Sequence, residues 1–230
     1  MNSKTRTNRR FTVQKRRCLW CVALALVFLV SACRGEQTNP CDEGGTLFND
    51  TFEEERNCGW ALYNRNGASS TIGDGVLRLT TSQPGQIWWT NPGRNFDDVI
   101  ITAEVEQVSG PVDNAFGVIC RYQDSENFYV FLISSDGFYA IGKYESGSDQ
   151  VVYLSGDGGY VASDAINQGQ ARNSIRASCV ADELTLMVNG ELLESVTDTT
   201  FLTGDIGLGA STFQSGALTV DYDNVRVLAP

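Results

Sequence analysis

The chain has 230 residues, with 17 Lys and Arg against 28 Asp and Glu, a net charge of −11 and no histidine. The lack of histidine excludes Ser-His and Cys-His catalytic arrangements and any metal site with histidine ligands. Seven basic residues and no acidic ones precede Cys33, so the remainder is strongly acidic, which argues against nucleic acid or anionic lipid as a partner.

Residues 1–32 have the pattern of a secretory signal peptide. After a basic start, an apolar run extends from Cys18 to Val30, shorter than the roughly 20 residues that a transmembrane helix needs. The run ends in Leu29-Val30-Ser31-Ala32-Cys33, which resembles the lipobox of bacterial lipoproteins. The resemblance implies cleavage before Cys33, a lipid on its thiol and a membrane-anchored protein in the bacterial envelope, facing outside the cytoplasm. An ordinary signal peptide is the alternative.

Four cysteines follow Cys33, and an even number in an exported chain indicates two disulfides. Three pairings are possible. We expect Cys41–Cys58, which would pin the N-terminal tail to the domain, and Cys120–Cys179, which would join two strands of the core. A metal site is the alternative, but no CxxC spacing occurs after Cys33.

Residues 33–45 are predicted to form a lipidated tether, and residues 46–230 a single all-β domain. Runs of β-branched and aromatic residues recur between turn sequences, at intervals of about 8–12 residues. A helical turn at most is expected near residues 163–167. The predicted strands, in chain order, are Thr46–Phe52, Ser70–Ile72, Val76–Thr80, Gln86–Thr90, Val99–Val108, Ala115–Gln123, Phe128–Ser134, Phe138–Tyr144, Asn173–Val180, Leu184–Val188, Leu192–Val196, Asp205–Ala210 and Ala217–Leu228. This many strands predict two stacked antiparallel sheets.

Asp136-Gly137 fits a two-residue hairpin turn, in which Ile133 would face Ala140. Residues 124–127 would form the preceding loop, with Tyr122 opposite Tyr129. The resulting core face is almost purely apolar and comprises Cys120, Tyr122, Tyr129, Phe131, Ile133, Phe138 and Tyr144. The other face comprises Ile119, Arg121, Phe128, Val130, Leu132, Tyr139, Ile141 and Lys143.

Four segments carry a family resemblance: Gly117 to Phe131, Asp136-Gly-Phe-Tyr139, Leu186-Met-Val-Asn-Gly190 and Val220-Asp-Tyr-Asp-Asn224. Together they resemble the concanavalin A-like (laminin-G-like) jelly-roll superfamily, near its bacterial 3-keto-disaccharide hydrolase-like branch. The resemblance covers residues 46–229 and implies a two-sheet sandwich. It does not specify an activity, because this fold carries lectins, glycosidases and adhesion modules alike.

The outward-facing Arg121, Tyr139 and Lys143 are the predicted carbohydrate-binding residues, since sugars stack on rings and bind planar polar groups. Trp88 and Trp89 are adjacent in a strand and must point to opposite faces, so one of them is expected to join this site. A partly covered outer face without a ligand is the alternative interpretation.

Glu104 and Glu106 lie two apart in a strand, a spacing within reach of a glycosidase carboxyl pair. However, glycosidases of this superfamily carry a Glu-x-Asp-x-(x)-Glu pattern, and the chain has no such string. We therefore assign no catalytic residue. The superfamily also often holds a structural calcium where the first and last strands meet, and the matching positions are Asp50 and Asp223.

The sequence thus predicts a surface-tethered, non-catalytic module that binds a glycan. A glycoside hydrolase or lyase acting on extracellular polysaccharide is the first alternative. A structural or adhesion lipoprotein that binds an envelope protein is the second.

Overall fold

The computed structural model describes residues 40–42, 45–148 and 150–230, which belong to one compact unit, Thr38–Pro230. The predicted signal peptide, the lipidation site at Cys33 and most of the tether lie outside the described residues. Within the described part of the chain, no helix has the length and apolarity needed to cross a membrane.

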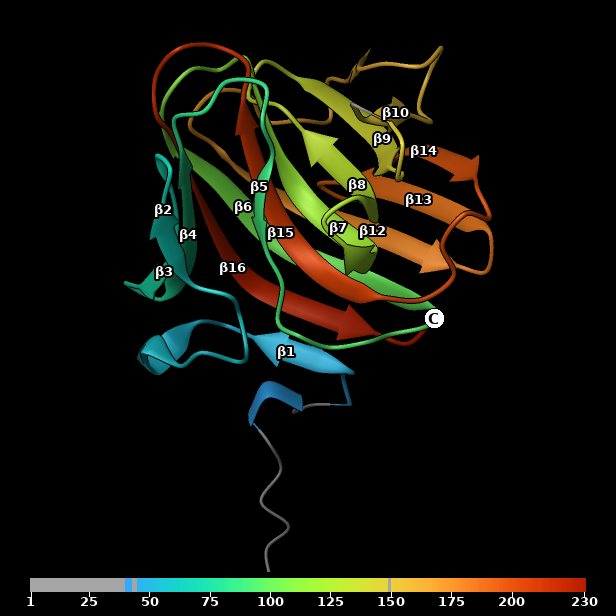
Figure 1. The fold of residues 1–230 in the computed structure, drawn as a ribbon, viewed down its shortest axis with the longest axis horizontal. Coiled ribbons are helices and arrows are strands. Elements are labelled where there is room, and N and C mark those ends of the chain that lie inside the picture. Colours follow the sequence, from blue (N-terminus) through green and yellow to red (C-terminus); the bar gives the residue numbers. More distant parts are fainter. Residues whose placement is uncertain (1–39, 43–44, 149) are drawn as a thin grey trace, which may run out of the picture. The chain divides into compact units, whose positions relative to one another are not determined.

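The described residues form two stacked antiparallel sheets, as predicted, with short 3₁₀ turns at Pro40–Asp42 and Glu53–Glu55 (Figure 1). The nine-stranded sheet contains β1 (Phe48–Asp50), β2 (Tyr63–Arg65), β3 (Ala68–Gly73), β4 (Val76–Thr81), β6 (Val99–Ser109), β12 (Arg172–Val180), β13 (Glu183–Val188), β14 (Glu191–Thr197) and β16 (Leu218–Leu228). The seven-stranded sheet contains β5 (Trp88–Thr90), β7 (Asn114–Asp124), β8 (Asn127–Ile133), β9 (Phe138–Tyr144), β10 (Val152–Tyr153), β11 (Val161–Ala162) and β15 (Asp205–Thr212).

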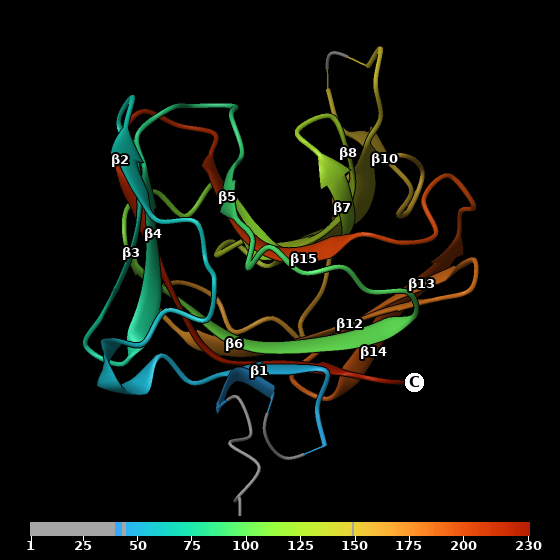
Figure 2. The same ribbon diagram turned by 60° about the horizontal axis from the view of Figure 1, so that its bottom comes forward.

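Segments distant in sequence are neighbours in both sheets. The order of the larger sheet is β14-β13-β12-β6-β16-β4-β3-β2, with β1 also paired to β16, and that of the smaller is β10-β9-β8-β7-β15-β5, with β11 paired to β9. The two last strands of the chain therefore lie inside the sheets and not at their edges. Figure 2 shows the seven-stranded sheet curving upward from β15 toward β7 and β8 on one side and toward β5 on the other, where β2, β3 and β4 of the larger sheet rise beside it.

The core lies between the sheets because alternate residues of each strand point inward. In β6 every second side chain from Val99 to Val105 is buried, as the sequence alternation predicts. Tyr222 crosses this core: its hydroxyl donates to the Gly209 carbonyl at 2.7 Å and accepts from the Gly117 amide at 3.3 Å. The sheets are thus joined by polar as well as apolar contacts.

Both predicted disulfides are present. Cys41–Cys58 joins the first 3₁₀ turn to the segment after β1, and Cys120–Cys179 joins β7 of one sheet to β12 of the other. All four cysteines are buried within the core cluster. The second disulfide therefore crosses the middle of the sandwich, as expected from the sequence.

The predicted register of the β8–β9 hairpin is wrong by one residue. The connection is a three-residue loop, residues 135–137, closed by the Ser134 amide donating to the Phe138 carbonyl at 2.8 Å, so that Ile133 pairs with Tyr139 and not with Ala140. A one-residue slip moves every side chain of a strand to the opposite face. In β9, Tyr139 and Lys143 consequently point toward the core side, and Tyr144 points outward.

A second correction concerns β7. The pairing with β8 shifts between Cys120 and Asp124, and Arg121 has a positive φ of 52° at this irregularity. The bulge turns the Arg121 side chain inward and Tyr122 outward, the reverse of the predicted orientation.

Candidate functional site

The outer face of the seven-stranded sheet is apolar, although it does not face the other sheet. A separate cluster lies there, made of Ala115, Ile119, Phe128, Val130 and Leu132, with Ile87, Trp89, Tyr122, Tyr144, Val151 and Tyr160 packed against it. A contiguous apolar patch on the outside of a domain often marks a binding surface. We call this face with its side walls the aromatic groove.

One half of the aromatic groove is a row of rings in contact, contributed by three strands and the end of a fourth. Phe128 of β8 is fully buried beneath it, with its ring centroid 5.2 Å from that of Trp89, 5.5 Å from that of Tyr122 and 4.7 Å from that of Tyr144. Trp89 and Tyr122 are also 6.1 Å apart. The half-buried rings of Trp89, Tyr122 and Tyr144 thus all pack against the buried ring of Phe128.

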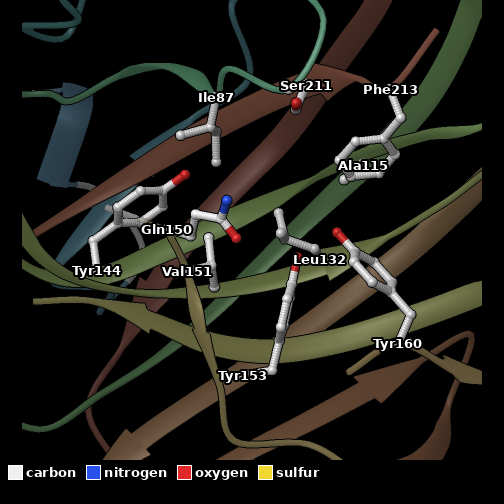
Figure 3. A pocket seen from close by; sticks show the side chains of 11 residues that line it. Ile87, Ala115, Leu132, Tyr144, Gln150, Val151, Tyr153, Tyr160, Ser211 and Phe213 are labelled. Atoms are coloured by element: carbon white, nitrogen blue, oxygen red, sulfur yellow. The ribbon is translucent and has the colours of Figure 1, made fainter. Parts of the chain in front are cut away.

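The other half is walled by rings from the short strand β10 and from connections between strands. Tyr153 and Tyr160 make an edge contact at 5.4 Å, and Tyr160 makes another with Phe213 at 6.0 Å. Figure 3 shows Tyr144, Tyr153, Tyr160 and Phe213 arranged around Leu132 of the sheet. The segment between β9 and β11 therefore builds a wall that the sheet alone would lack.

Three adjoining hollows run along this face. The central one, of about 280 Å³, is lined by Gly85, Ile87, Ala115, Leu132, Tyr144, Gln150, Val151, Tyr153, Tyr160, Ser211 and Phe213 (Figure 3). The second, of about 440 Å³, shares Ile87 with the central one. It is lined by Ala61, Tyr63, Arg65, Gln86, Ile87, Trp88, Trp89, Thr90, Asn91, Tyr122 and Ser125.

The third, which we call the end hollow, has about 370 Å³ and shares Tyr153, Tyr160 and Phe213 with the central one. Its remaining lining is Asp113, Asn114, Ser134, Asp136 and Phe138. Shared lining residues thus connect the three hollows into one row.

The central hollow carries no charge from its described lining residues at neutral pH. It has neither carboxylate nor basic side chain. Burial raises the pKa of the Tyr144 hydroxyl to about 12, and burial likewise raises the pKa of Tyr153 and of Tyr160. These hydroxyls therefore stay protonated and can both donate and accept hydrogen bonds.

The structure brings two of the five predicted ligand-binding residues to the groove. Trp88 and Trp89 both line the second hollow, with Trp89 on the outer face and Trp88 in a tilted contact with Tyr63 at a centroid distance of 5.9 Å. Trp89 neighbours Tyr122, where the sequence analysis placed Arg121.

The other three predicted ligand-binding residues lie elsewhere. Arg121 is 1% exposed, donates to the Phe201 carbonyl at 2.9 Å and pairs with Asp98 at 3.1 Å. Tyr139 is buried on the core side. Lys143 pairs with Asp198 at 3.0 Å. Their misplacement follows from the bulge at Arg121 and the one-residue slip in β9.

The two residues predicted to hold calcium do not share a site. Asp50 pairs with Val225 in register, as expected for adjacent first and last strands, but its carboxylate is buried and accepts from the Phe52 amide at 2.8 Å and Trp60 Nε1 at 2.9 Å. Asp223 lines a hollow on the outer face of the larger sheet. No group of three or more Asp, Glu, Cys or His residues that could hold a metal ion gathers among the described residues. Asp50 and Asp223 therefore do not converge on a common calcium site.

Glu104 and Glu106 lie on that same outer face, away from the groove. Arg172 reaches both, at 2.9 Å from Glu104 and 3.4 Å from Glu106. Opposite them in register are Asp223 and Asp221, and Arg78 holds Asp221 through two bonds of 2.7 Å. The pair belongs to a group of four adjacent carboxylates flanked by Arg172 on one side and Arg78 on the other, and these ion pairs need no substrate to explain them.

Similar folds occur among solved structures of other proteins. A carbohydrate-binding module, CBM66 from Bacillus subtilis, is 17% identical, with a TM-score of 0.56 over 74% of this chain and 96% of that chain. A Bacillus licheniformis β-glucanase is 12% identical, with a TM-score of 0.57 over 82% of this chain and 100% of that chain. The chain has the concanavalin A-like jelly-roll fold. At these identities the likeness extends to the fold alone.

A third structure with this architecture is a Bacillus subtilis protein of unknown function with a galectin-like fold. It is 12% identical, with a TM-score of 0.58 over 80% of this chain and 96% of that chain. No family model and no curated protein matches the sequence.

Sequence reasoning missed most of the groove. Tyr122 and Tyr144 were assigned to the core, and Tyr153, Tyr160 and Phe213 were assigned no role. The signal that could have found Tyr144 is Ser135, which extends the Asp-Gly turn to three residues and reverses the faces of β9. Tyr122 points outward because of the bulge at Arg121.

Proposed function

We propose that the domain is a non-catalytic carbohydrate-binding module, held at the bacterial cell surface by a lipid on Cys33, which binds a glycan along the aromatic groove. The observation that carries the proposal is the row of three adjoining hollows walled by half-buried aromatic rings. Binding sites of this kind combine apolar walls with a few polar groups that fix orientation. Sugar rings present flat C–H faces to aromatic rings and hydroxyls to the tyrosines.

A glycoside hydrolase is the second candidate, favoured by one observation. Glycosidases use two carboxyl groups on either side of the scissile bond. The central and second hollows contain no Asp or Glu among their described lining residues, whereas Asp113 and Asp136 both line the end hollow. Catalysis would therefore have to occur at that end of the groove.

The test is binding of the non-lipidated form, residues 34–230 with both disulfides intact, to a polysaccharide array, followed by calorimetric titration of the bound glycans. We expect saturable binding and no release of reducing ends. Trp89→Ala and Tyr153→Ala are each expected to weaken binding about tenfold, because each removes a stacking ring worth about 1–2 kcal/mol.

Leu192→Ala is the matched control, since Leu192 is 63% exposed on β14 and lines none of the three hollows. Its affinity should equal that of the unmodified protein. Absence of binding to every glycan would refute the proposal and favour an envelope protein as partner. Release of reducing ends that Asp113→Asn or Asp136→Asn abolishes would establish the hydrolase instead.

A further inference from the structure

The end hollow differs chemically from the rest of the groove. Four aromatic rings line it, two of them well exposed: Phe138 is 37% exposed and Phe213 41%. Tyr153 and Tyr160 complete the wall, in edge contact with each other and, for Tyr160, with Phe213. Aromatic faces carry partial negative charge and attract cations as well as apolar groups.

Two carboxylates stand at the same hollow. Asp136 lies in the β8–β9 loop and accepts from the Ser134 hydroxyl, and Asp113 lies just before β7 and accepts from Gln214 Nε2 at 3.1 Å. Neither forms an ion pair with a basic residue in the described parts of the chain. Both negative charges are therefore uncompensated.

The field of Asp136 reaches the aromatic wall. Its charge is among the causes, after burial, that raise the pKa of the Tyr160 hydroxyl. No Lys or Arg lines the end hollow or the central one, and Arg65 lines only the second hollow. The charge of the lining therefore changes along the groove: the end hollow is negative and aromatic, and the central hollow is uncharged.

We propose that the end hollow selects a positively charged amine on the bound glycan, the substituent of an unacetylated amino sugar. The ammonium group would lie against the aromatic wall and be paired with Asp113 and Asp136, the arrangement in which aromatic faces and opposite charge reinforce each other. This inference rests on the proposed function, because it assigns a ligand class to one part of the same groove.

The test compares glucosamine and galactosamine oligosaccharides with their N-acetylated counterparts of equal length, titrated calorimetrically in low salt. At about two pH units below the pKa of the sugar amine, the unacetylated oligosaccharides carry ammonium groups and should bind about tenfold more tightly than the N-acetylated ones. The preference should shrink as salt is raised, because screening weakens the charge attraction. It should vanish above the pKa of the amine.

The double variant Asp113→Asn/Asp136→Asn should lose the preference and bind the two forms with equal affinity. Asp157→Asn is the control: Asp157 is an exposed acid in the segment between β10 and β11 and does not line the end hollow. Its preference for amines should be unchanged.

Equal affinity of the unmodified protein for the two forms would overturn the inference and leave the carbohydrate-binding module standing. A preference that persists in the double variant would also overturn it, because the charge would then act from elsewhere. If no saccharide of either form or of the polysaccharide array bound, both proposals would fail together.

Discussion

Asp198 anchors the chain between β14 and β15 against the edge of the seven-stranded sheet. Its carboxylate accepts from the Tyr129 hydroxyl at 2.5 Å, the Thr200 amide at 2.8 Å and Lys143 Nζ at 3.0 Å. Burial alone would raise the pKa of Asp198, but these bonds outweigh it and lower the pKa to about 2. A single side chain thus ties three separate segments together.

The low pKa predicts a pH-dependent contribution to stability. Because the folded pKa lies below the unfolded value near 3.9, the contribution is complete above about pH 4 and is lost as the pH falls toward 2. Allowing for solvent screening, Asp198→Asn should lower the free energy of unfolding by about 1 kcal/mol at neutral pH and hardly at all near pH 2.

Urea unfolding of both proteins at the two pH values checks this, with the exposed Asp157→Asn as control. An equal loss of stability at both pH values would show that packing, and not charge, is what Asp198 contributes.

At the scale of the element, the β8–β9 loop decides which residues can meet a ligand. Gly137 has a φ of +92° there, and a Cβ on it would lie 2.5 Å from Gln168 Nε2. Gly137→Ala should therefore destabilise the domain by about 1–2 kcal/mol, the cost of a left-handed residue with a side chain.

Thermal unfolding measures the effect. Gly73→Ala is the matched control, since its Cβ would meet open space and its φ is not positive. A Gly137→Ala variant as stable as the Gly73→Ala control would contradict the strained geometry of this loop.

Alternation and turn residues were sufficient to predict thirteen of the strands, because buried and exposed positions differ strongly in polarity along each strand. The two disulfides were predicted from the even number of cysteines after Cys33. The strands that were missed are β2, β10 and β11, which span three residues or fewer. The register of the hairpin was harder to predict, because a two-residue Asp-Gly turn and a longer loop that ends in Asp-Gly look alike in sequence. The choice between them decides which face Tyr139 and Tyr144 each take.

The candidate site was predictable only where a regular strand builds it. Trp89 follows from its position in β5, whereas Tyr160 and Phe213 come from connections without a repeating pattern. Their approach to each other depends on the path of the chain between β9 and β12 and after β15, which short-range sequence patterns do not encode.

At the scale of the whole molecule, Cys120–Cys179 is the covalent link between the two sheets. It closes a loop with a sequence separation of 59 residues. On the chain-entropy model, losing it costs about 4 kcal/mol, against about 3 kcal/mol for the shorter loop of Cys41–Cys58. The double variant Cys120→Ala/Cys179→Ala should therefore unfold at the lower temperature of the two disulfide-deleted proteins.

Calorimetry of the two variants, each lacking one disulfide, provides the comparison. A larger loss of stability on removing Cys41–Cys58 would mean that the N-terminal segment, and not the contact between the sheets, limits the stability of the domain.

The positions of β15 and β16 bear on how the chain acquires this form. β16 separates β6 from β4 in one sheet, and β15 separates β7 from β5 in the other, so neither sheet is continuous until residues 205–228 have been synthesised. Pairings of such long sequence separation form slowly. Neither sheet of the domain can therefore close strand by strand in chain order, and until β15 and β16 insert, β4, β5, β6 and β7 each have an edge without its final partner.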